Sequence, residues 1–239
     1  MSILENQTVD CPSCGKPMAF AAAHSVLADR RPDLRAAILA DTFQTERCPH
    51  CEARFRRQPT LNYLDIGRGQ WILAKPAAEV ADWPSLEAQA QGIFELGYGS
   101  LAPVPAQEIG RGLAVRVVFG WPAFREKLLA VDAGLDDVAL ECLKLRLLRT
   151  LDGPALADTV EMRLREADDE MLTFAWLDAD VEEVLEILRV PRALYDDMRA
   201  SSDGYDGVRK ALAQGPFVDM NRILVDPVDR EVLPEAAEL

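Results

Sequence analysis

Cys11-Pro12-Ser13-Cys14-Gly15 and Cys48-Pro49-His50-Cys51-Glu52 are the two stretches of sequence that decide the N-terminal fold. A gap of two residues lets both thiolates of one turn reach the same ion. Two such turns supply the four soft, tetrahedrally placed ligands that Zn²⁺ prefers. We therefore expect one structural zinc ion, organising a small β-rich domain, bound by Cys11, Cys14, Cys48 and Cys51.

The residues around these cysteines suit tight turns. Pro12 and Pro49 fix φ directly after the first cysteine of each pair, and Gly15 can adopt a left-handed conformation without strain. Glu52 stands where the first motif has glycine, so a positive φ there would be strained by about 1–2 kcal/mol. Structural zinc contributes on the order of 10 kcal/mol, so we expect ligation to survive this strain.

The two C-x-x-C pairs could in principle serve redox chemistry instead of metal binding. A lone C-x-x-C can be a thioredoxin-like redox pair, but two proline-bearing copies favour a metal site. His50 could replace one thiolate, although an all-sulfur site does not need it. We expect Cys142 to be an inert core residue and His24 to lie in a turn or on the surface. Four thiolates leave no open position for an activated water, so the expected zinc is structural and not catalytic.

The charge of the 239-residue chain, −14 in total, is uneven. Residues 1–75 hold ten Lys or Arg and eight Asp or Glu, whereas the rest holds 16 basic and 32 acidic residues. An acidic body repels phosphate backbones, so nucleic acid is an unfavoured partner. No apolar run approaches the roughly 18 residues that cross a bilayer, and residues 1–6 lack the features of a secretory signal. We expect a protein of the cytoplasm, a compartment that keeps thiols reduced, without membrane contact.

The pattern predicts an α+β fold in two domains. Residues 1–122 should form a zinc ribbon-like β domain with helical insertions, and residues 123–239 an acidic domain of helices and a β-hairpin. In the first domain we expect helices at 32–41 and 83–96, a hairpin at 61–66 and 71–74, a loop at 103–105, and a strand at 113–121 that returns to the same sheet.

In the second domain one helix is apolar over most of its surface. It covers residues 135–151, and we expect it to be buried in a core or in a homodimer interface. A hairpin is expected at 159–165 and 171–177, acidic helices near 181–188, 191–199 and 207–213, and a last strand at 217–225.

The first 150 residues resemble the CpXC domain family of bacteria, a set of presumed zinc-binding proteins. The resemblance is carried by the two cysteine motifs, by Arg31-Pro32-Asp33-Leu34-Arg35 at a helix start, by Leu61-Asn62-Tyr63-Leu64-Asp65 at the hairpin and by Val115-Arg116-Val117-Val118. The stretch 126–144 is also similar. Glu52 departs from the glycine that usually follows the second pair. The resemblance implies zinc binding and a ribbon-like fold, and it implies no activity.

Three functions are consistent with these features. The first is a non-catalytic zinc module that recognises another protein. The second is nucleic-acid binding through the ribbon, with phosphate contacts from Arg47, Arg54, Arg56 and Arg57, although these side chains could instead pair with the acidic half. The third is a metal-dependent nuclease-like enzyme that uses Glu141 and Lys144, although an i,i+3 ion pair explains this spacing without chemistry. The common phosphate-loop, zinc-protease and hydrolase motifs are missing from the sequence.

Overall fold

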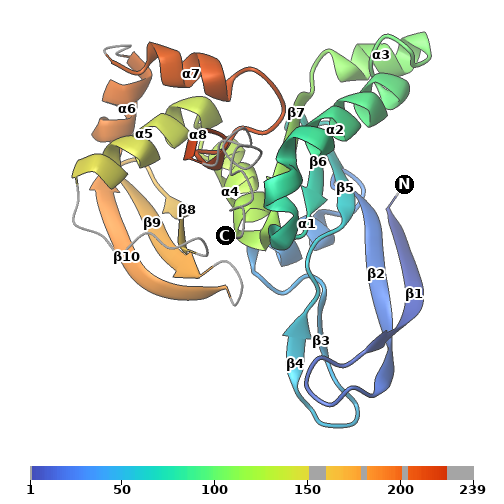
Figure 1. Ribbon diagram of the computed structural model, residues 1–239. Helices are drawn as coiled ribbons and strands as arrows, with labels where there is room; N and C mark the ends of the chain where they lie inside the picture. Colours follow the sequence, from blue (N-terminus) through green and yellow to red (C-terminus); the bar gives the residue numbers. More distant parts are fainter. Residues whose placement is uncertain (1, 151–159, 179–181, 201–203, 225–239) are drawn as a thin grey trace, which may run out of the picture.

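Three β-sheets and eight α-helices form the part of the chain that the computed structural model describes, residues 2–150, 160–178, 182–200 and 204–224 (Figure 1). The mixed α+β class expected from the sequence is therefore confirmed. The strands are β1 Ile3–Asp10, β2 Pro17–Leu27, β3 Thr45–Arg47, β4 Arg54–Arg56, β5 Leu61–Asp65, β6 Gln70–Lys75, β7 Ala114–Phe119, β8 Val160–Ala167, β9 Met171–Asp178 and β10 Glu183–Pro191. The helices are α1 Pro32–Leu39, α2 Trp83–Gly97, α3 Val104–Gly110, α4 Gly120–Asp132, α5 Asp137–Thr150, α6 Ala193–Ala200, α7 Asp206–Leu212 and α8 Asn221–Leu224, with a 3₁₀ turn at Ala77–Asp82.

The largest sheet has five strands in the order β1-β2-β5-β6-β7. Its β5–β6 hairpin is the one predicted at residues 61–74. Strand β7 lies parallel to β6, which confirms that the strand near residue 113 returns to this sheet. It ends earlier than expected, because Gly120 has a φ of +79° and begins α4.

Helices cover both faces of this sheet at its centre. On one face α1 and α4 contribute Ile38, Trp121 and Phe124 to a core with Tyr63 and Ile72. On the other face, Phe94 of α2 and the later Phe217 pack against Trp71, Leu73 and Phe119. Burial on both faces explains the continuous apolar run in β6.

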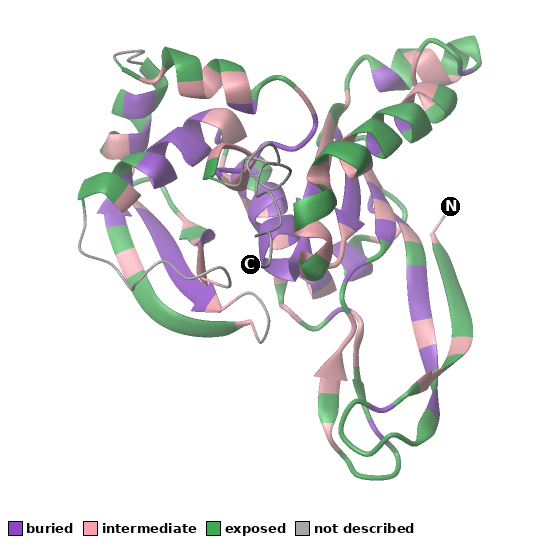
Figure 2. Ribbon diagram, in the orientation of Figure 1, coloured by how far each residue is buried: buried purple, intermediate pink, exposed green. Residues whose placement is uncertain are grey.

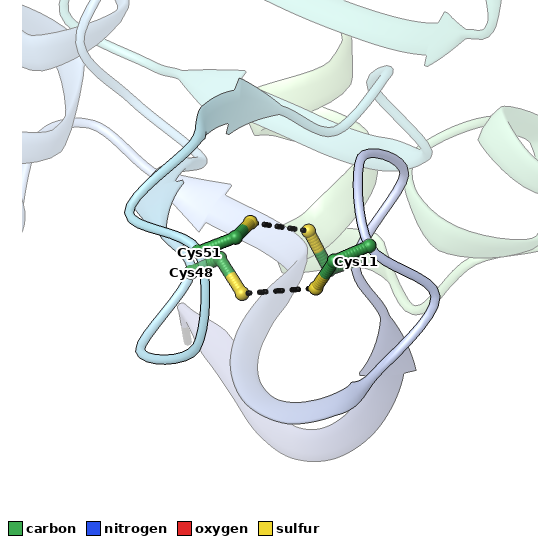
Figure 3. A group of neighbouring side chains, drawn as sticks. Cys11, Cys48 and Cys51 are labelled. Carbon is green, nitrogen blue, oxygen red and sulfur yellow. Dashed lines mark hydrogen bonds between the residues drawn. The ribbon is translucent and has the colours of Figure 1, made fainter.

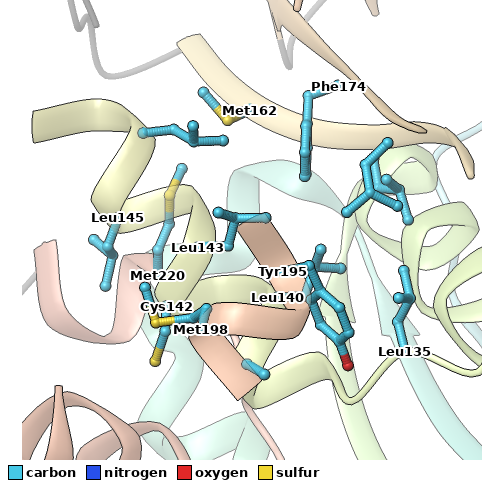
Figure 4. Close-up of a cluster of buried hydrophobic side chains, with 14 of the residues drawn as sticks. Leu135, Leu140, Cys142, Leu143, Leu145, Met162, Phe174, Tyr195, Met198 and Met220 are labelled. Carbon is cyan, nitrogen blue, oxygen red and sulfur yellow. The ribbon is translucent and has the colours of Figure 1, made fainter. Parts of the chain in front are cut away.

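A separate antiparallel sheet, β10-β9-β8, packs against α5, α6 and α7 around the largest apolar core (Figure 4). Leu140, Cys142 and Leu143 of α5 are fully buried there, together with Met162 and Phe174 of the sheet. Of the two interpretations of this apolar helix, the structure shows the intramolecular core. Cys142 is a buried core residue, as expected.

Three element predictions are wrong. Residues 183–191 form β10 where a helix was expected near 181–188, because the stretch pairs along its length with β9. Residues 221–224 form α8 where a strand was expected at 217–225. The Asp219 carboxylate accepts the Asn221 N–H at 2.9 Å and so begins the turn. The expected loop at 103–105 is the start of α3, in which Pro105 takes a position that needs no N–H partner. Residues 181 and 225 lie outside the described part.

The burial of each strand follows from its position in the fold (Figure 2). Strand β1 is exposed along most of its length, whereas β9 is buried almost throughout. Among the described helices none is long and apolar enough to span a bilayer.

Candidate metal centre

The four cysteines of the two motifs lie at the tips of two hairpins. Residues 11–16 connect β1 to β2, and residues 48–53 connect β3 to β4 (Figure 1). The first tip closes with the Cys11 N–H donating to the Lys16 carbonyl at 2.9 Å, and the second with Cys48 N–H donating to the Ala53 carbonyl at 2.9 Å. We call these two tips the first and second knuckle. The same local sequence pattern thus produces the same backbone turn twice.

Each knuckle also holds a left-handed residue directly after its second cysteine. Gly15 has a φ of +69° and Glu52 a φ of +60°. Their N–H groups donate to the carbonyls of Cys11 and Cys48 at 2.8 and 2.9 Å. The positive φ considered for Glu52 is therefore present in the structure.

The knuckles bring the four sulfur atoms together (Figure 3). All four Sγ atoms lie within 4.8 Å of one another. The separation is 3.7 Å between Cys11 and Cys51 and 3.8 Å between Cys14 and Cys48. These distances are too long for disulfides, which measure about 2 Å. A tetrahedron with metal–sulfur bonds of about 2.3 Å has edges of about 3.8 Å, so the donor set and its spacing fit one four-coordinate metal ion.

In both knuckles the first cysteine is buried and the second is exposed. Cys11 and Cys48 are 1% and 0% exposed, whereas Cys14 and Cys51 are exposed. Met18 and the partly buried Val9 and Phe55 pack against the two buried cysteines. The site therefore lies at the edge of a small apolar cluster that sequence analysis did not identify.

The thiols influence one another strongly. Burial raises the pKa of Cys11, but the N–H groups of Cys14 and Ser13, with the thiols of Cys48 and Cys14, outweigh it and lower this pKa to about 6. The Ala53 N–H favours the Cys51 thiolate, yet burial and the three neighbouring sulfurs raise the pKa of Cys51 to about 12. The opposite shifts of Cys11 and Cys51 show that one thiolate disfavours another beside it, a conflict that a bound cation would remove.

His50 is not among the sulfur ligands. Its Nε2 lies 3.2 Å from the Pro17 carbonyl oxygen, which links the second knuckle to the start of β2. His24 lies near the surface, with Nε2 3.3 Å from the Glu5 carboxylate. The structure places both histidines where the sequence analysis favoured them.

One residue that joins the two hairpins was missed. Gln44, which has a φ of +56°, donates from Nε2 to the Ala21 carbonyl at 2.8 Å and accepts the Ala23 N–H at 3.0 Å. It therefore fixes the chain entering β3 against the middle of β2. A lone glutamine between elements gives no sequence signal for such a role.

The four arginines of the nucleic-acid hypothesis do not form one free patch. Arg47 and Arg54 are exposed. Arg56 bonds Glu182 at 3.2 Å and lies 4.4 Å from the Trp121 ring centroid, and Arg57 lies 5.3 Å from the ring centroid of Phe20. Arg56 therefore pairs with the acidic C-terminal half, which was the alternative to phosphate binding for these arginines.

Glu141 and Lys144 belong to a buried ionic cluster, which we define as Glu126, Glu141, Lys144, Arg163 and Asp219. Lys144 Nζ lies 2.8 Å from Glu126 and 2.9 Å from Glu141, and these three side chains are fully buried. The i,i+3 ion pair is therefore real. The other three members come from α4, β8 and the residues before α8, a combination that only the tertiary fold brings together.

The acidic residues near this pair are also engaged. Asp137 bonds Arg116 at 2.6 Å and Lys127 at 3.1 Å. Asp132 bonds Arg35 at 2.7 Å and Arg68 at 3.0 Å. Like Glu141 and Lys144, these two aspartates therefore act as ion-pair partners within the fold.

No curated protein and no solved structure matches the chain in comparisons with known proteins. The family model described as CpXC protein matches residues 9–144, more than half of the chain. The matched region begins just before the first knuckle and ends at Lys144 of the buried ionic cluster.

Proposed function

This chain belongs to the CpXC protein family, and from that premise we propose that it is a non-catalytic protein whose cluster of four cysteines binds one structural Zn²⁺. The observation that carries the proposal is the pair of matching knuckles whose four sulfurs lie within 4.8 Å of one another. Thiolates are soft ligands, and an all-thiolate tetrahedron is the usual structural zinc site. Its four sulfurs fill the coordination sphere, so the ion joins hairpins and does not activate water.

The metal proposal has a direct test. Elemental analysis of the purified chain should find about one zinc per chain, and Cys11→Ser combined with Cys48→Ser should abolish it. Cys142→Ala is the matched control, because Cys142 is buried in the other core and should keep full metal content. Zinc that is missing from the parent chain, or retained by the double variant, would overturn the proposal.

We further propose that the chain acts through another protein. Five large apolar side chains are exposed on α2, α3 and their connection: Ile93, Leu96, Leu101, Val104 and Ile109. Leu96, Leu101 and Val104 are 65–70% exposed, and exposed apolar groups of this kind often mark interaction surfaces. The acidic body around them fits a partner with basic side chains around an apolar surface.

The partner proposal is tested with surface variants. Crosslinking in native lysate should recover a partner protein with the parent chain. The double variant Leu96→Asp, Leu101→Asp should no longer recover it. Leu185→Asp is the control, because Leu185 is also half exposed but lies on β10. Equal recovery of the partner by both variants would contradict this surface assignment, while leaving the metal proposal standing.

The other hypotheses have less support. Of the four arginines proposed for nucleic-acid binding, Arg47 and Arg54 are the two that stay exposed in the described structure. A nuclease centre at Glu141 and Lys144 would need substrate access to fully buried side chains. Homodimerisation and the division into residues 1–122 and 123–239 remain proposals. The first can be tested by light scattering and the second by expressing the two parts separately.

A further inference from the structure

A cavity of about 480 Å³ lies between parts of the chain that are distant in sequence. Thr45, Arg54 and Arg56 of the β3–β4 hairpin form one wall. Pro122 of α4, Arg165 of β8 and Leu177 of β9 form others. Because Arg54 is exposed, the cavity can be reached from solvent. Its volume falls in the range of small-molecule sites.

Positive charge exceeds negative charge around this cavity. Asp41, which also lines it, is shared by three guanidinium groups, at 3.0 Å from Arg165, 3.4 Å from Arg56 and 3.6 Å from Arg125. Three arginines line the cavity itself, namely Arg54, Arg56 and Arg165, and Arg125 lies behind Asp41. The carboxylates that line the cavity are Asp41 and Glu182, so its described lining carries a net charge of +1 in a chain of −14.

Burial and neighbouring positive charge make it less favourable for these arginines to be charged. The pKa of Arg125 is lowered, first by burial and then by the charge of Arg165. Burial likewise lowers the pKa of Arg56, against the opposing effect of Glu182 and Asp41. An additional anion would relieve this repulsion.

Hydrogen-bond donors remain unused in the same wall. Thr45 Oγ1 and Arg56 Nη2 are buried and lack a hydrogen-bond partner within the described ranges. Arg54 makes no ion pair with any described residue. Buried donors without acceptors are costly, and because Thr45 and Arg56 line the cavity, an oxygen-rich anion there can accept from them once these side chains turn toward it.

We propose that this cavity binds the phosphate group of a small phosphomonoester. A phosphomonoester carries about −1.5 to −2 charges and three acceptor oxygens, so it can pair with more than one of the three arginines that line the cavity. A carboxylate has one charge and two acceptor oxygens, and it therefore engages fewer of these donors. The guanidinium fork suits phosphate geometry, and Phe55, Pro122 and Leu177 offer apolar contacts for the rest of the ligand. The site does not include the cysteines, but one of its walls is the β3–β4 hairpin that the proposed zinc ion supports, so binding is measured on the metal-loaded chain.

Isothermal titration calorimetry of the full-length chain at low salt provides the test. The probes are inorganic phosphate, ribose 5-phosphate and acetate. We expect saturable binding of both phosphates, with ribose 5-phosphate at least as tight, and acetate weaker by about tenfold or more. Binding of acetate as tight as that of phosphate, exclusion of ribose 5-phosphate, or no saturable heat with either phosphate would overturn the proposal.

Variants locate the binding. Arg54→Ala, at an exposed position, and Thr45→Val, which removes an unused donor, should each weaken phosphate binding by about tenfold. Arg111→Ala changes the charge equally at an exposed position outside the cavity and should leave the affinity unchanged. Equal affinities for Arg54→Ala and Arg111→Ala would overturn the assignment, and circular dichroism verifies that each variant is folded.

Discussion

Glu52 occupies in the second knuckle the position that Gly15 occupies in the first, with φ of +60° and +69° and the same N–H bond to the preceding first cysteine. An L-residue in this conformation is strained by about 1–2 kcal/mol relative to glycine. We therefore expect Glu52→Gly to raise the free energy of unfolding of the metal-loaded chain by about 1 kcal/mol, measured by urea denaturation. Metal content should not change.

The reverse change at the first knuckle is the natural control. A Cβ added at Gly15 meets no atom within 4 Å, so Gly15→Ala should destabilise by about 1 kcal/mol through backbone strain alone. If Glu52→Gly instead lowered stability, the Glu52 side chain would have to make a contribution larger than the strain.

Removal of the metal should loosen the hairpin tips and leave the C-terminal core folded. Strands β3 and β4 form a two-stranded sheet of three residues each, which is marginal without further support. After treatment with a chelator, we expect hydrogen–deuterium exchange to accelerate in residues 9–20 and 45–56. Protection should persist in α5 and β9, which lie in the large core.

Two results would contradict this prediction. One is a cooperative loss of protection throughout the chain, which would mean that the metal stabilises the whole fold. The other is unchanged exchange in both knuckles, which would mean that Gln44 and the apolar cluster around Cys11 and Cys48 hold the tips without metal.

The sequence predicted the parts of the fold that rest on local chemistry. The C-x-x-C spacing identified the four clustered cysteines, and the Gly67-Arg68-Gly69 turn between apolar runs identified the β5–β6 hairpin. The apolar helix near residues 135–151 also appeared as α5. In each case neighbouring residues carry the whole signal.

The parts that were missed depend on distant partners. Strand β1 is exposed on both faces, so Glu5-Asn6-Gln7-Thr8 shows no apolar alternation, and only pairing with β2 makes it a strand. Strand β10 was read as an acidic helix, and its pairing with β9 overrides the helical pattern. The cavity and the buried ionic cluster likewise combine side chains more than 100 residues apart or from several elements.

Loss of one charge from the buried ionic cluster should be costly. Lys144→Met leaves Glu126 and Glu141 without the ammonium that lies within 2.9 Å of each. We expect the free energy of unfolding to fall by about 3–5 kcal/mol, measured by denaturant unfolding. Arg146→Met, at an exposed position of the same helix, should change stability by about 0.5 kcal/mol or less.

A second replacement shows whether unpaired charge causes that loss. Glu141→Met together with Lys144→Met removes both members of the i,i+3 pair, and Glu126 keeps Arg163 at 3.3 Å. The double variant should therefore be more stable than Lys144→Met alone. If the double variant were less stable, packing volume and not unpaired charge would explain the cost.

Glu141 should make stability depend on pH in the neutral range. Burial raises its pKa from 4.5 to about 7, with Asp219 and Glu126 adding to the rise against the opposing charge of Lys144. One of its oxygens, Oε1, lacks a hydrogen-bond partner among the described residues. The folded state therefore holds a proton on this carboxyl more tightly than the unfolded state, so its contribution is complete below pH 4.5 and is lost as pH rises through 7.

Glu141→Gln, a neutral replacement of similar shape, isolates this effect. Between about pH 4.5 and 7.5 the stability of the parent chain should fall relative to that of Glu141→Gln, by up to roughly 3 kcal/mol. Asp219 does not interfere in this window, because its pKa is lowered to about 2 and its contribution is lost only as pH falls through that value. Glu166→Gln, at an exposed position of β8, should follow the parent chain at every pH. Parallel pH profiles for the parent chain and Glu141→Gln would show that Glu141 stays ionised in the folded state throughout the window, held so by Lys144.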